Sequence, residues 1–323
     1  MIDTKTKDIL LSKNQINLFG YEHYFASLIS LFKKKKLPNT ILLNGQKGSG
    51  KATFVYHFIN YILSINEDNK YSTDDFSIDP NNINYKNICN ETHPNFFGLD
   101  NLQKHENIKI EKVRNVMNFL NKSTYSSNIK IILIDSIDCL NIYSSNALLK
   151  VLEDSNDKTF FFLVNNNPQK ILNTIKSRCI EFKFFFTIEE KKKILKKLLE
   201  QYSIDFDVNN LDQIYYFDSP GNLLKYLLIL DESNLELINN KPLCILHLID
   251  KYKQKNDPEL LKFISFLIEL FYNELSLKNS NKLKYYFNKK IELLKKIDSV
   301  KKFNLDKKNL FLTIKQTIEN EAK

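Results

Sequence analysis

The sequence predicts an α/β fold with a mostly parallel sheet flanked by helices, followed by two helical regions. Three features of the sequence lead to this prediction. Apolar runs typical of buried strands alternate with segments of helical period up to residue 186. A glycine-rich segment joins one such strand to one such helix at residues 44–53. From residue 188 onward the pattern is helical, without strand-like runs.

The predicted strands are short and almost entirely apolar, as expected for a parallel sheet that is covered on both faces. They are residues 41–43, 131–134, 160–164 and 180–186. The predicted helices between them have apolar residues at helical spacing, at 21–36, 53–63, 110–120 and 146–152. Residues 66–90 are polar, and we expect a loop or a poorly ordered insertion there.

The second half of the chain predicts helices only. They lie at 188–202, 211–216 and 220–230, with several more after residue 235. A chain of 323 residues suits two or three domains. We therefore expect boundaries near residues 187 and 235, with an α/β domain at 1–187, a small helical domain at 188–235 and a helical C-terminal domain at 236–323.

The composition favours a folded cytoplasmic protein. No uncharged apolar run reaches the roughly 18 residues that a membrane span needs, and the first twelve residues do not resemble a signal peptide. The four cysteines lie far apart, so no CxxC metal pattern exists and we expect no metal site built on them. The net charge of +9 is compatible with nucleic-acid work, but a general bias toward lysine explains it equally well.

The glycine-rich segment NGQKGSGKAT at 44–53 has the form of a phosphate-binding loop. Three of the six glycines in the chain, Gly45, Gly48 and Gly50, lie within it. Backbone amides of such a loop surround phosphate oxygens, and the start of the following helix adds partial positive charge. The side chain of Lys51 would reach the terminal phosphates.

The residue after Lys51 departs from this motif. A serine or threonine hydroxyl there binds Mg²⁺, and this chain has Ala52. Thr53 follows, but one helical residue rotates a side chain by about 100°. We therefore expect poor placement of a metal even where nucleotide binds.

A second motif follows the apolar run at 131–134. Asp135 ends the run and is suited to steady hydrated Mg²⁺, as in a Walker B segment. An ATPase has glutamate next, to polarise the attacking water, whereas this chain has Ser136, which is not basic enough for that task. Asp138 is expected on the following turn.

Two further strings, SNALLKVLED at 145–154 and TIKSRC at 174–179, complete a recognisable set. Together with LPNT at 37–40, the loop and the Asp135 strand, they resemble the bacterial AAA+ clamp-loader subunits of DNA polymerase III. Within that group the chain resembles the delta-prime type, and its variants at 51–53 and 135–136 are similar to those of alphaproteobacterial members. The resemblance implies an AAA+ domain, a helical lid and a helical collar that assembles into a heteropentamer.

The resemblance also implies roles for individual residues. Arg178 of the Ser-Arg-Cys string would act as an arginine finger on the ATP of the next subunit. Asn165 or Asn166 would occupy the sensor 1 position, and Asn222 stands where many relatives have the sensor 2 arginine. The chain's own site would then bind ATP or ADP with Mg²⁺ weakly or not at all. Relatives with a zinc module have four cysteines where this chain has only Cys89, so we expect no zinc.

The implied partners are the gamma/tau and delta subunits, and through them the sliding clamp and primer-template DNA, with no membrane. The chain would belong to the DNA polymerase III holoenzyme and be itself a weak or inactive ATPase. One alternative is the gamma/tau-type motor, which the string VNNNPQK at 164–170 favours. Another is an unrelated P-loop kinase or NTPase, which would leave the Ser-Arg-Cys string unexplained.

Overall fold

A computed structural model describes residues 11–99, 108–122, 129–167, 170–206, 218–230, 240–255, 258–303 and 307–321. Contacts divide the chain into two compact units. One unit ends at Lys197 and also includes Ser219–Asn222. The other contains the rest of the chain from Leu198 onward.

The first unit is built on a parallel five-stranded sheet of order β2-β3-β4-β1-β5. Its strands are β1 (Thr40–Gly45), β2 (Phe96–Leu99), β3 (Lys130–Ile134), β4 (Thr159–Asn165) and β5 (Ile180–Phe184). The four predicted strands are all present. The sequence prediction missed β2, because this edge strand has only four residues and one of them is Gly98, which packs no side chain.

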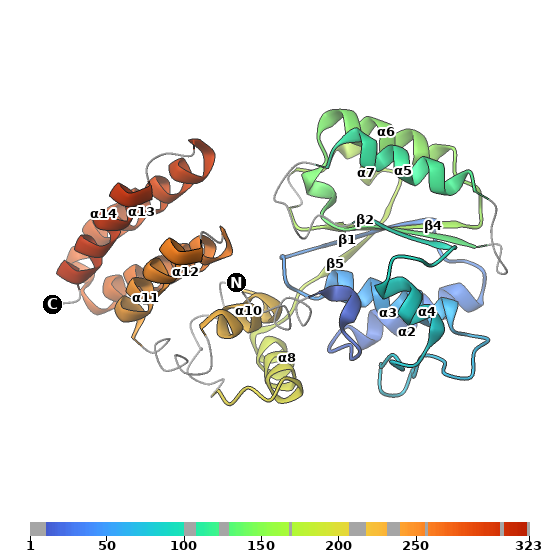
Figure 1. Ribbon diagram of the computed structural model, residues 1–323, viewed down its shortest axis with the longest axis horizontal. Coiled ribbons are helices and arrows are strands. Elements are labelled where there is room, and N and C mark those ends of the chain that lie inside the picture. The colour runs from blue at the N-terminus through green and yellow to red at the C-terminus, as the bar shows by residue number, and fades with distance from the viewer. Residues whose placement is uncertain are drawn as a thin grey trace. The chain divides into compact units, whose positions relative to one another are not determined.

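Helices cover both faces of this sheet (Figure 1). One face carries α2 (Glu22–Lys33), α3 (Lys51–Leu63) and α4 (Ile83–Cys89), and the other carries α5 (Ile110–Leu120), α6 (Ile142–Glu153) and α7 (Asn173–Lys176). Successive strand residues alternate between the two cores, as the pleat requires. Thus Leu43 lies in the core with α2 and α3, while Leu42 lies in the core with α5 and α6.

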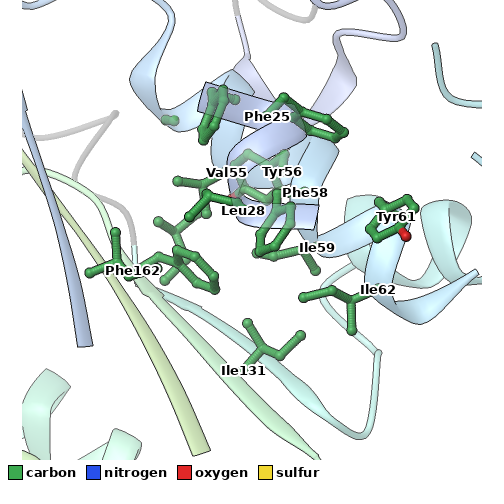
Figure 2. Close-up of a cluster of buried hydrophobic side chains, with 14 of the residues drawn as sticks. Phe25, Leu28, Val55, Tyr56, Phe58, Ile59, Tyr61, Ile62, Ile131 and Phe162 are labelled. Carbon is green, nitrogen blue, oxygen red and sulfur yellow. The ribbon is translucent and has the colours of Figure 1, made fainter. Parts of the chain in front are cut away.

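The core beneath α2 and α3 combines aromatic with aliphatic side chains, as Figure 2 shows. Phe25 of α2 meets Phe54 and Phe58 of α3 edge to face, with ring centroids 5.6 and 5.8 Å apart. Phe58 in turn packs against Phe162 of β4. This packing fixes α3, and therefore the loop that precedes it, against the sheet.

The prediction of a loop over residues 66–90 is wrong for its last part. Residues Ile83–Cys89 form α4, whose first turn is capped by the Asn82 side chain accepting from the Tyr85 amide at 2.9 Å. Only Ile88 of this helix is fully buried, so the sequence has no apolar period long enough to reveal it. Upstream, Ser72 and Ser77 form an isolated antiparallel bridge.

The second unit is helical, as predicted. Its described α-helices are α10 (Pro220–Leu230), whose first three residues belong to the first unit, and α11 (Lys241–Lys255), α12 (Pro258–Lys278), α13 (Leu283–Phe303) and α14 (Lys307–Glu321). Helix α8 (Ile188–Gln201) leads into this unit after β5. Tyr226 of α10 stacks on Phe263 of α12 with centroids 4.2 Å apart. The predicted helix at 211–216 lies outside the described residues, and the division into three domains at 187 and 235 remains a prediction. Within the described residues, no helix is both long and apolar enough to cross a membrane.

Candidate functional site

The glycine-rich segment forms a loop at the carboxyl end of β1 and leads directly into α3. Gly48 and Gly50 have φ angles of 81° and 82°, a left-handed conformation that glycine adopts without strain. Because α3 begins at Lys51, its first backbone amides have no helical partner and lie at the loop. The local structure is therefore suited to hold an anion such as a polyphosphate.

Lys51 is buried and folded onto its own loop. Its Nζ donates to the carbonyl oxygens of Gly45 at 2.9 Å and Gln46 at 2.7 Å. Burial lowers the pKa of Lys51 to about 8, while the carboxylates of Asp135 and Asp138 act in the opposite direction. The structure thus brings the loop lysine and the Asp135 region to the same edge of the sheet.

The two residues after Lys51 do not supply a metal ligand in the expected place. Ala52 is buried at 7% exposure and has no hydroxyl. Thr53 is half-buried on the next position of α3, about 100° further around the helix. The residues present therefore fit a phosphate group better than they fit Mg²⁺.

A polar network joins the end of β3 to the end of β4. The Nδ2 of Asn166 donates to the Ser136 hydroxyl at 3.1 Å, and its backbone amide donates to Asp138 Oδ1 at 3.1 Å. Asp138 lies on the short 3₁₀ helix η2 (Ile137–Cys139), on the turn where it was expected. Ser136 itself has φ 64°, which is uncommon for a residue with a side chain and marks a constrained turn.

Asn165 is fully buried and engaged within the sheet. Its Nδ2 donates to Asn44 Oδ1 at 2.5 Å, across the pairing of β4 with β1. Its Oδ1 accepts the Asn167 amide at 3.1 Å. Asn165 and Asn166 therefore differ: Asn165 links two strands, and Asn166 contacts the turn that follows Asp135.

The start of α10 also contacts the phosphate loop. The Ser219 hydroxyl donates to the Lys47 carbonyl at 2.7 Å, and the Gly221 amide donates to the Gly48 carbonyl at 3.0 Å. Asn222 Nδ2 donates to the same Lys47 carbonyl at 3.2 Å. The uncharged amide of Asn222, which was expected at the sensor 2 position, thus lies beside the loop.

Tyr21 also lies against the loop, beside Ser49, although no sequence pattern singles it out. Its ring stacks on Phe186 with centroids 4.1 Å apart and contacts Phe184 at 4.3 Å. Burial raises the pKa of Tyr21 above its ordinary value, and the Ser49 hydroxyl opposes this rise. An aromatic residue with φ 65° is hard to anticipate from a sequence pattern.

Arg178 lies elsewhere, between α7 and β5. Its Nη2 forms an ion pair with Glu153 at the end of α6, and its Nη1 donates to the Thr174 carbonyl at 2.8 Å. The Arg178 side chain remains 39% exposed and lines a pocket of about 380 Å³. Its neighbour Cys179 is partly buried, which raises the pKa of its thiol to about 12 and makes it a poor nucleophile.

Arg178 and Lys51 lie beyond opposite ends of the strands of one sheet: Arg178 at the amino ends and Lys51 at the carboxyl ends. Strands β1 and β5 are parallel, with Ile41 paired to Ile180 and Gly45 paired to Phe184. Arg178 precedes the amino end of β5, whereas Lys51 follows the carboxyl end of β1. At about 3.3 Å per residue, the amino and carboxyl ends of β1 alone are about 17 Å apart.

The described residues contain no group of three or more His, Cys, Asp or Glu side chains arranged to hold a metal ion. Besides Tyr21, the sequence analysis did not predict the partners of two predicted residues: Asn44 for Asn165, and Glu153 and Thr174 for Arg178. These pairs depend on strand register and on where helices end, which a single sequence does not specify.

Comparisons with known proteins agree with this architecture. A profile of the family described as "DNA polymerase III, delta subunit" matches residues 20–186. The DNA polymerase III subunit gamma of Buchnera aphidicola (subsp. Acyrthosiphon pisum) is 27% identical over 230 residues, which cover 69% of this chain and 61% of that protein. The delta' subunit of Pseudomonas aeruginosa is 32% identical over 90 residues, 28% of this chain and 27% of that one.

The chain therefore spans less than two thirds of the length of these two relatives. A solved structure of a DNA polymerase III gamma subunit-related protein from Thermotoga maritima covers 92% of this chain with a TM-score of 0.50 and 18% identity. At that identity the similarity shows a shared fold. The family profile matches more than half of the sequence, across the whole sheet and both motifs. The chain thus belongs to the DNA polymerase III, delta subunit family, within the clamp-loader group that its motifs resemble.

Proposed function

We propose that this chain is a delta-prime-type subunit of the DNA polymerase III clamp loader that supplies Arg178 to an ATP site on a neighbouring subunit. The observation that carries the proposal is that Arg178 lies at the amino ends of the strands, whereas Lys51 lies at their carboxyl ends. A guanidinium there cannot reach a phosphate held at the chain's own loop. A partly exposed, permanently charged side chain is instead suited to stabilise charge on a phosphate presented by another protein.

The chain's own nucleotide site lacks several groups that an ATP-hydrolysing motor subunit would need. Ala52 removes the hydroxyl that would bind Mg²⁺, and Ser136 replaces the carboxylate that would polarise water. Asn222 provides no positive charge beside the loop. ATP or ADP would bind through loop amides and Lys51, with little hydrolysis following. In the assembly, the proposed partners are gamma/tau and delta subunits, with the sliding clamp and primer-template DNA reached through the complex in the cytoplasm.

A gamma/tau-type motor is the second candidate, because the gamma subunit of Buchnera aphidicola is similar over 69% of the chain. A motor would need catalytic parts in its own site. The two functions are therefore distinguished by which residues control ATP hydrolysis.

The proposal is tested with the loader reconstituted from this chain and the other subunits. Arg178→Ala should lower DNA-stimulated ATP hydrolysis by about 10³-fold at the one site that it serves, the usual effect of losing such an arginine. Arg178→Lys should restore little, since an ammonium lacks the planar fork. Lys158→Ala removes an exposed cation just before β4, at the same sheet edge, and serves as the control. A rate unchanged by Arg178→Ala would refute the role in trans.

A further inference from the structure

The contacts of Arg178 show how its guanidinium is held before any partner is present. One contact is the ion pair with Glu153, and the other is the hydrogen bond from Nη1 to the Thr174 carbonyl at 2.8 Å. Thr174 lies in α7, one helical turn before Arg178, and Glu153 is the last residue of α6. The guanidinium therefore bridges the ends of two helices.

Glu153 lies at the carboxyl end of α6, where a negatively charged side chain destabilises a helix. The carboxyl end of a helix carries partial negative charge, so an acidic side chain there is unfavourable. Asp154 follows as the C-cap residue, which adds a second acidic group. A residue that conflicts with its local structure often has another role. Here the compensating contact of Glu153 is Arg178.

The geometry leaves the guanidinium able to bind a further anion. Arginine has five N–H donors, and the two contacts to Glu153 and Thr174 leave three for other acceptors. Arg178 and Glu153 both line the pocket of about 380 Å³, together with Pro38, Asn39 and Ser177. In the chain, an exposed run of lysines at 33–36 lies just before Pro38, which lines this pocket.

We infer that Glu153 is a positioning residue: it orients the Arg178 guanidinium so that the remaining donors face an incoming phosphate of the neighbouring subunit. The inference rests on the proposed role of Arg178 in trans. Orientation matters because a misplacement of about 1 Å can reduce a rate by about 10²-fold. The ion pair is exposed and therefore weak, so it can hold the side chain without preventing small adjustments when the partner binds.

The test compares Glu153→Ala with Glu153→Gln in the reconstituted loader. At the site that Arg178 serves, Glu153→Ala should lower kcat for DNA-stimulated ATP hydrolysis by about 3- to 10-fold, with KM for ATP within about twofold, because orientation affects the reacting state more than binding. Glu153→Gln should stay within about twofold of the wild type, since its amide oxygen still accepts from Nη2. Asp154→Ala is the matched control: it removes an adjacent exposed carboxylate from the same helix end and should have no effect.

A double variant separates the outcomes. Glu153→Ala combined with Arg178→Ala should be no slower than Arg178→Ala alone, because Glu153 acts through Arg178. An unchanged or faster rate for Glu153→Ala, or an equal loss for Asp154→Ala, would overturn the inference while leaving the arginine role intact. No effect of Arg178→Ala would instead overturn the proposed function. Thermal unfolding of each purified variant verifies that the chain is folded.

Discussion

Individual residues at the phosphate loop show which parts of a nucleotide site the chain keeps. Lys51 is present and buried, and its neighbours Asp135 and Asp138 lie close enough to affect its pKa. The hydroxyl after Lys51 and the carboxylate after Asp135 are missing. The site therefore has groups that are suited to bind phosphate and lacks the hydroxyl and the carboxylate that would organise Mg²⁺ and water.

Burial of Lys51 predicts a pH dependence of stability. Its pKa is about 8 in the folded chain and 10.5 when exposed. Between these values the unfolded chain holds more protons, so the free energy of unfolding should rise with pH, by as much as about 3 kcal/mol. Urea unfolding from pH 7.5 to 10.5 should show this rise in the wild type and a flatter profile in Lys51→Met.

Lys47→Met provides the control for this measurement. Lys47 is an exposed lysine in the same loop, so its substitution removes the same charge without removing a buried amine. It should change the pH profile much less than Lys51→Met does, because the charge of Lys47 is the smallest of the influences on the pKa of Lys51. Equal slopes for the wild type and Lys51→Met would show that Lys51 is not desolvated.

At the scale of elements, the loop between β1 and α3 depends on two glycines with different surroundings. A Cβ on Gly48 would lie 2.3 Å from the buried Ser219 hydroxyl, whereas a Cβ on Gly50 would meet nothing within 4 Å. Both residues have left-handed φ angles. An alanine at either position would therefore meet the same backbone strain, and the two positions differ in the contacts that its Cβ would make.

Gly48→Ala should destabilise the chain more than Gly50→Ala. The left-handed backbone costs each alanine roughly 1–2 kcal/mol. Gly48→Ala should lose about 1 kcal/mol or more beyond this, because Ser219 must give up its hydrogen bond to the Lys47 carbonyl. Urea unfolding measures the difference. Equal losses would mean that the contact between the loop and the start of α10 does not contribute.

Two buried histidines, His57 and His93, hydrogen-bond to segments packed around α3, and their burial predicts that the stability of the chain falls at acid pH. His57 of α3 lies between the Tyr71 hydroxyl at 3.0 Å and the Gln15 carbonyl at 3.1 Å, and His93 lies between Asn84 and the Asn95 amide. Burial lowers the pKa of His57 to about 3 and that of His93 to about 4.

Below the ordinary histidine pKa of 6.5, the unfolded chain binds more protons, so stability should fall as pH falls. Each histidine should contribute about 2 kcal/mol of loss between pH 7 and pH 5. His57→Gln and His93→Gln should each reduce that loss, even with lower stability at pH 7. His23→Gln, a change at an exposed histidine of α2, should keep the wild-type slope. Similar slopes in all four proteins would contradict the prediction.

The elements also show what the sequence could predict. Strands such as β3 and β4 were predictable because continuous apolar runs are buried on both faces of a parallel sheet. Strand β2 and helix α4 were not, because neither has an apolar pattern long enough to be distinctive. Motif order predicted which residues gather at the loop. The pairing of Asn44 with Asn165 depends on tertiary structure, as does that of Glu153 with Arg178.

The whole molecule combines an α/β unit with a helical unit, and membership in the DNA polymerase III, delta subunit family places it among clamp-loader proteins. The division at residues 187 and 235 and the heteropentameric assembly remain predictions. ATP hydrolysis by the purified chain alone tests the proposed role, because an arginine that acts on a neighbouring subunit does not contribute to hydrolysis when that subunit is absent.

The purified chain should show no ATP turnover above background in the presence of Mg²⁺, because Ala52 and Ser136 leave its own site without a metal hydroxyl and a base. Lys51→Ala should give the same background and defines it. Steady hydrolysis by the wild type that disappears in Lys51→Ala would instead favour the gamma/tau-type motor.

Parallel pairing of β1 with β5 has an evolutionary consequence. Because Lys51 and Arg178 lie beyond opposite ends of these strands, a substitution beside one of them does not contact the other. Natural selection can therefore act on the two ends separately. If Arg178 acts in trans as proposed, a lineage can lose ATP hydrolysis at the loop and still retain the arginine that acts on a neighbouring subunit.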